Sequence, residues 1–295
     1  MADTGYIEER SPEGVSLVVT GRWSAQADEV LKRGAADGLV LNYARGFCEP
    51  DLEFLDGAWA LRRLDVLDRT IRDLSPIGRL ADTLESLSVQ AAPEAELELT
   101  ALTHLEAIAG EWALLRGTLR DVEELQSVVT WRFGERNLHA FRDHLDLRQL
   151  TIKEAPSLEE CSGLAALTEL RKLGILLARS LRDISDVGEL TSLVDLELEA
   201  CRAIEAIDDV EALRSLKFLG LSDCGEIQSL RPVAALERLE VLHAWGDTCI
   251  IDGDLSPLAR LPRLREIRMR ARASYTPRLP DLLDALRTQA SSAAE

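Results

Sequence analysis

Two pairs of adjacent acids are the residues of this chain whose types and spacing come closest to catalytic chemistry. Glu159-Glu160 and Asp208-Asp209 could act as paired carboxylates in acid–base catalysis. Both pairs fall between regularly spaced apolar residues, however, where we expect solvated turns. The sequence has no phosphate-binding GxxxxGK loop, no CxxC pair and no HExxH motif. We therefore expect no enzyme activity, no metal site and no cofactor.

Histidine and cysteine, the other residues that bind metals or act as nucleophiles, are scattered. His139 and His144 are five residues apart, so they do not share a helical face. The five cysteines are Cys48, Cys161, Cys201, Cys224 and Cys249. Because their number is odd and three of them occupy apolar repeat positions, we expect five free thiols, three of them as small apolar filler. Free thiols and the absence of a signal peptide predict a reducing compartment, the cytoplasm.

A repeat of 23 residues organises most of the sequence. The first apolar residue of each expected strand recurs at this interval as Leu147, Leu170, Leu193, Leu216 and Leu239. After Leu193, apolar residues alternate at Leu196 and Leu198, which is typical of a short strand. The apolar spacing then changes to three at Ile204 and Ile207, which favours 3-10 turns. Such coils bury their apolar residues only by stacking on neighbours.

These coils resemble the leucine-rich repeat, whose period is 20 to 29 residues. The resemblance is to the short-repeat class of bacterial internalins and phosphatase regulatory subunits. It implies an α/β solenoid, a right-handed horseshoe or arc with a parallel concave sheet and short helical or 3-10 convex turns. The sequence departs from the asparagine ladder common in this family, because the equivalent positions are Ala155, Ala178, Cys201, Cys224 and Asp247.

The repeat accounts for nearly the whole chain, so we expect one solenoid domain with two caps. Residues 1–60 form an N-terminal cap with the first in-phase strands, residues 61–272 the repeats, and residues 273–295 a capping helix and tail. The intervals are least regular between about residues 84 and 146. The expected cap elements are a strand at Val15–Thr20, a helix at about Ser24–Arg33, a strand at Leu39 and a helix at Leu279–Leu286.

The repeat also predicts which side chains face out of the concave sheet. Residues two, four and six positions after each marker leucine point outward, and the seventh begins the ascending loop. The acids and aromatic residues among these positions and the loops beside them are our candidate partner-binding residues. They are Trp112, Trp131, Asp195, Glu197, Glu199, Phe218, Asp223, His243, Trp245 and Asp247.

Three of the five tryptophans belong to this set. Aromatic side chains surrounded by charges are typical of interface hot spots. Trp245 lies in a regular coil, and we expect it to be exposed. Trp112 and Trp131 lie in degenerate coils, where a shift of one residue would place them in the core instead. The interval from Leu239 to Leu264 is two residues longer than those before it, which puts a lengthened loop beside Trp245.

The charge of the chain points to the class of partner. A net charge of −18 disfavours direct nucleic-acid binding and favours a basic protein. No apolar stretch is long enough to span a membrane. We expect a chain that is monomeric when unbound. The sequence favours a non-catalytic protein-binding module, in its sharper form a bacterial inhibitor or immunity-type protein that covers a toxin, nuclease or enzyme domain. The alternative is a regulatory scaffold subunit that positions an enzyme.

Overall fold

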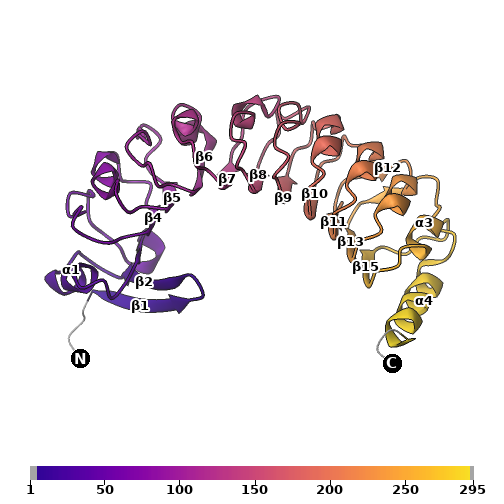
Figure 1. The fold of residues 1–295 in the computed structure, drawn as a ribbon, viewed down its shortest axis with the longest axis horizontal. Helices are drawn as coiled ribbons and strands as arrows, with labels where there is room; N and C mark the ends of the chain where they lie inside the picture. The colour runs from indigo at the N-terminus through magenta and orange to yellow at the C-terminus, as the bar shows by residue number, and fades with distance from the viewer. Residues whose placement is uncertain (1–4, 293–295) are drawn as a thin grey trace. The chain divides into compact units, whose positions relative to one another are not determined.

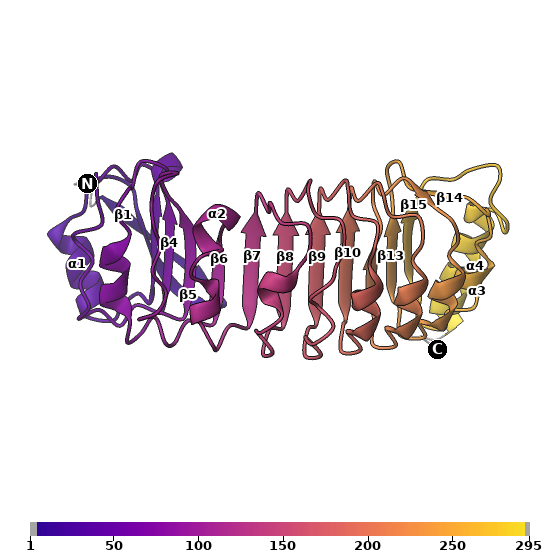
Figure 2. The same ribbon diagram turned by 90° about the horizontal axis from the view of Figure 1, so that it is seen from above.

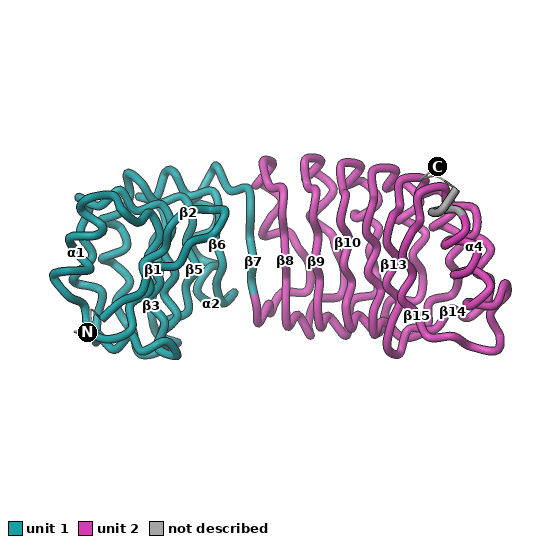
Figure 3. The backbone as a smooth tube through the Cα atoms, turned by 90° about the horizontal axis from the view of Figure 1, so that it is seen from below, with its two compact units in different colours: residues 1–130 teal, residues 131–295 magenta. Residues whose placement is uncertain are grey.

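Two compact units make up the chain, residues 1–130 and residues 131–295 (Figure 3). The computed structural model describes residues 5–292. The first four residues of the expected N-terminal cap and the last three of the expected tail therefore lie outside the described residues. In both units the chain runs through successive coils, each made of a strand, a loop and a turn on the opposite side.

The first unit begins with the strand–helix–strand segment that the sequence predicts. β2 (Gly14–Val19) pairs in parallel with β3 (Gly38–Asn42), and α1 (Ala25–Lys32) connects them. The hydroxyl of Ser24 caps α1 by accepting the amide hydrogen of Ala27 at 3.2 Å. A strand that the sequence did not predict, β1 (Tyr6–Ser11), pairs antiparallel with β2. The remaining strands are β4 (Arg63–Leu67), β5 (Ser86–Gln90), β6 (Ala107–Glu111) and β7 (Ser127–Trp131), which ends at the boundary between the units.

The second unit is the more regular one, and its strands are all parallel. Figure 2 shows several of them side by side along the unit. In chain order they are β8 (Gln149–Lys153), β9 (Lys172–Leu176), β10 (Asp195–Glu199), β11 (Phe218–Gly220), β13 (Val241–Ala244) and β15 (Glu266–Met269). Lys172 pairs with Asp195 and Asp195 with Phe218, each a step of 23 residues. The predicted repeat and its register are therefore confirmed.

Short turns occupy the side of the coils opposite the strands, as the threefold apolar spacing predicts. In the second unit this arrangement can be followed in Figure 1. The 3-10 turns are Tyr43–Arg45, Ser75–Leu80, Leu119–Asp121, His139–Phe141, Ser185–Glu189, Asp208–Ala212 and Arg231–Ala235. The further helices are α2 (Trp112–Leu115), α3 (Ser256–Ala259) and α4 (Leu279–Ser292), the last longer than predicted. Both units thus consist of leucine-rich repeats.

Inward side chains of successive coils form the core. Leu196 and Leu198 of β10 are fully buried, as are Ile204 and Val210 of the turn that follows. Burying one such side chain contributes roughly 1.5 to 3 kcal/mol, so the stacked apolar rows dominate the stability of the unit. Cys161, Cys201 and Cys224 are buried within these rows, and all five cysteines are free thiols.

The lengthened segment after β13 forms a small second sheet. β14 (Cys249–Ile250) pairs in parallel with β12 (Glu226–Ile227) of the preceding coil. The amide of Ile250 donates to the hydroxyl of the buried Tyr275 at 3.1 Å. The additional residues therefore have a structural role, because they pair with one neighbouring coil and are anchored by the C-terminal segment.

Candidate functional site

The outward side chains of the second unit share one side of its sheet, which we call the strand face. It consists of the outward residues of β8, β9, β10, β11, β13 and β15. Paired residues of parallel strands lie side by side, so the register defines rows of side chains across neighbouring coils. One row contains Gly174, Glu197, Gly220, His243 and Arg268. The strand face is thus a fixed array with one side chain from each coil in every row.

Three acids of β10 form the acidic part of the strand face. Asp195, Glu197 and Glu199 are half-buried and alternate with the buried Leu196 and Leu198, as the sequence predicts. Partial burial raises the pKa of Asp195, and Lys172, 3.9 Å away, partly offsets this effect. The carboxylates of Glu197 and Glu199 have no ion-pair partner in the part of the chain that the structure describes. Two acids therefore remain available for a basic group from outside.

Phe218 and His243 meet on adjacent strands of the strand face. Their rings are 5.1 Å apart at an angle of 85°, an edge-to-face contact between diagonal neighbours. Gly220 leaves room for this arrangement, because a Cβ atom there would lie 3.1 Å from the Phe218 ring. Nε2 of His243 lies 3.2 Å from Oε1 of Glu266, and this hydrogen bond is the main reason that the pKa of Glu266 is lowered. The two rings and this carboxylate form one connected cluster.

Trp245 is the large aromatic residue that projects from the strand face. Its side chain is 57% exposed, as the repeat predicts for a regular coil. Beside it lies a hollow of about 500 Å³, whose apolar wall includes Met269, Leu279 and Leu283. Two of these residues come from α4, which the sequence predicts only as a cap. Their helical spacing could predict the helix but not that one of its faces lies beside Trp245.

The two candidate acids in the loops are engaged within the unit. The backbone amide of Asp247 donates to Oδ1 of Asp223 at 3.0 Å, so Asp223 stabilises the next coil. The carboxylate of Asp247 lies 3.5 Å from Arg202 and 4.0 Å from Arg270. We had predicted that both acids contact a partner. Their present contacts leave Glu197 and Glu199 as the more available carboxylates.

The other two candidate tryptophans occupy different environments. Trp112 is only 4% exposed, so its placement on the concave face is wrong and the core alternative holds. It begins α2, which turns its side chain inward together with Leu115. The spacing of Trp112, Leu115 and Leu119 is helical and could have revealed this. Trp131 ends β7 in a half-buried position, at the same place in its coil as Trp245.

Residues with catalytic potential have structural surroundings. Glu159 lies on an outer turn and forms ion pairs with Arg136 and Arg182; its hydrogen bond with Arg136 is the main factor that lowers its pKa. Burial raises the pKa of the Cys161 thiol, which disfavours the reactive thiolate. Among residues 5–292, no group of three or more His, Cys, Asp or Glu side chains could hold a metal ion.

None of the helices in the described part of the chain combines the length and apolar character needed to cross a membrane.

Comparisons with known proteins concern the fold. No family model matches the sequence, and no curated protein matches it significantly. Among solved structures, an internalin (inlF) from Listeria monocytogenes is 15% identical; the match covers 74% of this chain and 78% of that one, with a TM-score of 0.42. The leucine-rich repeat domain of the type III effector XopL is 18% identical; the match covers 83% of this chain and 81% of that one, with a TM-score of 0.43. The chain's own 23-residue coils and their parallel strands identify it as a leucine-rich repeat structure.

Proposed function

We propose that this protein is a non-catalytic protein-binding module of the inhibitor or immunity type, and that its strand face covers a basic surface of a partner protein. The observation that carries this proposal is Trp245, which is 57% exposed beside an apolar hollow. A large aromatic side chain held on a regular sheet is costly to expose unless a partner covers it. Its surroundings combine an anchor with charged groups, as interface hot spots do.

The anchor has room for a complementary group. A partner side chain that enters the hollow of about 500 Å³ would contact Trp245 on one side and Leu283 of α4 on the other. Phe218 and His243 extend the aromatic surface toward β10. Backbone pairing between parallel strands holds these residues in place, so binding requires little ordering of the face. Pre-organisation of this kind favours tight binding through a small number of residues.

Charge supports a basic partner. Glu197 and Glu199 lie two strands away from Trp245 and have no ion-pair partner among residues 5–292. A chain of net charge −18 accelerates encounter with a basic protein and repels acidic ones. Lysine or arginine side chains of the partner would pair with the two glutamates while an apolar group occupies the hollow. The five free thiols fit a cytoplasmic location.

Capture from lysates of the cells that encode this chain, followed by binding kinetics of the purified partner, tests the proposal. We expect a basic protein to bind the wild type, and Trp245→Ala to weaken this binding by about 2 kcal/mol or more. The Glu197→Lys and Glu199→Lys double variant should slow association more than it speeds dissociation, because steering depends on charge. Association should also slow as the salt concentration rises.

Matched controls separate the strand face from the rest of the surface. Glu211→Lys and Glu237→Lys change the same charge on exposed positions of the outer side, and together they should affect association much less. A partner that is acidic, or whose binding is unchanged by Trp245→Ala and by the glutamate variants, would refute the proposal. A partner enzyme that stays fully active in the complex would replace inhibition with the scaffold role.

A further inference from the structure

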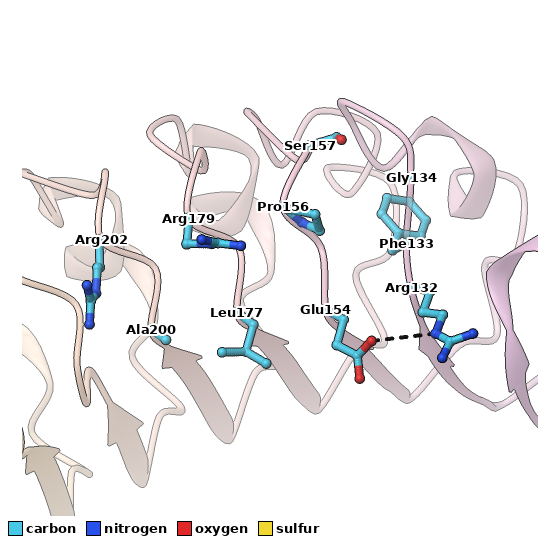
Figure 4. A pocket seen from close by; sticks show the side chains of 10 residues that line it. All are labelled: Arg132, Phe133, Gly134, Glu154, Pro156, Ser157, Leu177, Arg179, Ala200 and Arg202. Carbon is cyan, nitrogen blue, oxygen red and sulfur yellow. Dashed lines mark ion pairs between the residues drawn. The ribbon is translucent and has the colours of Figure 1, made fainter.

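A groove of about 620 Å³ lies at the edge of the second unit, where the strands end and the ascending loops begin (Figure 4). Its lining comes from four consecutive coils, between Arg132 and Arg202. Figure 4 shows Glu154, Leu177 and Ala200 in one row beside the strand ends, with Arg179 on the loop above Leu177. The groove therefore crosses the coils next to the strand face rather than on it.

The charge of this groove is opposite to that of the chain. Arg132, Arg179 and Arg202 line it together with one acid, Glu154, whereas the whole chain has a net charge of −18. Arg132 lies 3.8 Å from Glu154, and Arg202 lies 3.5 Å from Asp247. Arg179 is exposed and forms no ion pair with any residue that the structure describes. One guanidinium is thus available at the centre of a positively charged groove.

The row beneath Arg179 has an unusual backbone. Arg132, Glu154, Leu177 and Ala200 all have left-handed φ values, between 53° and 59°. This region suits glycine and asparagine, and for a bulky residue such as leucine it is a marked outlier. The Leu177 side chain is also 49% exposed. Its amide donates to the carbonyl of Glu199 at 2.8 Å, so pairing with the next coil maintains the strained conformation.

Together these features describe an apolar floor with a free cation above it. Leu177 and Ala200 offer an apolar surface, and the Arg179 guanidinium can form two parallel hydrogen bonds with a carboxylate. Adjacent coils are roughly 4.8 Å apart, so four coils span the length of about four to five extended residues. A nucleic acid fits poorly, because the acidic chain repels a polyanion outside this small area.

We propose that the groove binds an extended acidic and apolar peptide segment of a partner protein. A carboxylate of the segment pairs with Arg179, and a neighbouring apolar side chain packs on Leu177. This site is independent of the proposed strand-face function, because it takes a ligand of opposite charge through different residues. Such a segment could belong to any protein whose surface carries an exposed acidic loop or tail.

Fluorescence anisotropy with a labelled peptide of sequence Asp-Leu-Asp-Leu-Asp tests this site on the full chain. Arg179→Glu should weaken binding by about tenfold or more, as expected for loss of a charged hydrogen bond. Arg171→Glu is the matched control, since it makes the same charge change at an exposed position of the same coil outside the groove. Leu177→Asn should weaken binding without lowering the melting temperature, and a peptide with asparagine in place of aspartate should not bind.

Several outcomes would overturn the site. They are no binding of the peptide at millimolar concentration, equal losses for Arg171→Glu and Arg179→Glu, and equally tight binding of a single-stranded DNA oligonucleotide of the same net charge. Both arginines are exposed, so each variant should keep the wild-type circular dichroism spectrum and melting temperature. Glu197→Lys should leave peptide affinity unchanged, so that failure of this site and failure of the strand-face proposal can be distinguished.

Discussion

Two coils of this protein carry a tryptophan just after a strand, and the two side chains have opposite environments. Trp112 follows β6 in the first unit and is 4% exposed, whereas Trp245 follows β13 in the second unit and is 57% exposed. The strands before them are alike, with inward residues buried and outward residues half-buried. The difference therefore arises where each strand ends.

The position after the outward row is where the two coils separate. In six consecutive coils this residue has a left-handed backbone; the residues are Arg132, Glu154, Leu177, Ala200, Asp223 and Gly246. The turn keeps the preceding residue, such as Trp245, on the outward row. Trp112 occupies the equivalent position in its coil but begins α2 instead. A helical turn there directs the side chain into the core.

This comparison teaches that loop geometry decides whether a residue near a strand end is anchor or core. Outward and inward rows follow from the twofold alternation in both units. Beyond the strand, the same number of residues after the marker leucine can lead into a left-handed turn or a helix. A surface inferred from the repeat is therefore most secure within the strands.

The largest effect should come from the two tryptophans. Trp112→Ala should lower the free energy of unfolding by about 3 to 5 kcal/mol, because it leaves a cavity in the core of the first unit. Trp245→Ala should change it by less than about 0.5 kcal/mol, as expected for an exposed side chain. Urea denaturation measures both values. A large loss for Trp245→Ala, or a negligible one for Trp112→Ala, would invalidate the comparison.

A smaller loss is expected at Gly246. Its φ is 72°, and a Cβ atom there would lie 2.0 Å from Oδ1 of Asp223, which accepts the amide hydrogen of Asp247. Gly246→Ala should therefore lower the free energy of unfolding by about 1 to 3 kcal/mol through strain and the weakened hydrogen bond. Urea denaturation of the variant measures this loss.

The equivalent position one end of the row away provides the control. Leu177→Asn should raise the free energy of unfolding by up to about 1 kcal/mol, because asparagine adopts the left-handed conformation more readily than leucine. Opposite signs for the two variants would establish that the row is strained at leucine and relaxed at glycine. A loss at both positions would mean that side-chain contacts outweigh backbone conformation.

The smallest effect concerns Asp195, whose pKa is raised by partial burial. Between its usual pKa and the raised value, the folded chain holds a proton that the unfolded chain releases, so stability falls as the pH rises through this window. Asp195→Asn should therefore melt slightly higher than the wild type at pH 7. The gap should close as the pH falls below the usual aspartate pKa. A lower melting temperature at pH 7 would show that the ion pair with Lys172 outweighs burial.

Much of the second unit could be predicted because each inference depended on local periodicity. The inward rows, the outward acids of β10 and the exposure of Trp245 all follow from a strand that starts at a known leucine. The left-handed row could not be predicted in this way. Its residues include arginine, glutamate, leucine and alanine, which share no preference for that conformation, so only Gly246 gives a signal.

The sequence by itself determined the repeat, the strand register of the regular coils and the identity of the buried rows, because apolar spacing reports which side chains need neighbours. Only the tertiary structure decided that Trp112 is core, that α4 forms a wall of the hollow beside Trp245, and that Asp247 lies between two arginines. It also brought Arg132, Arg179 and Arg202 together around one groove. These outcomes depend on contacts between coils and on backbone turns, which the spacing of residues along one chain does not encode.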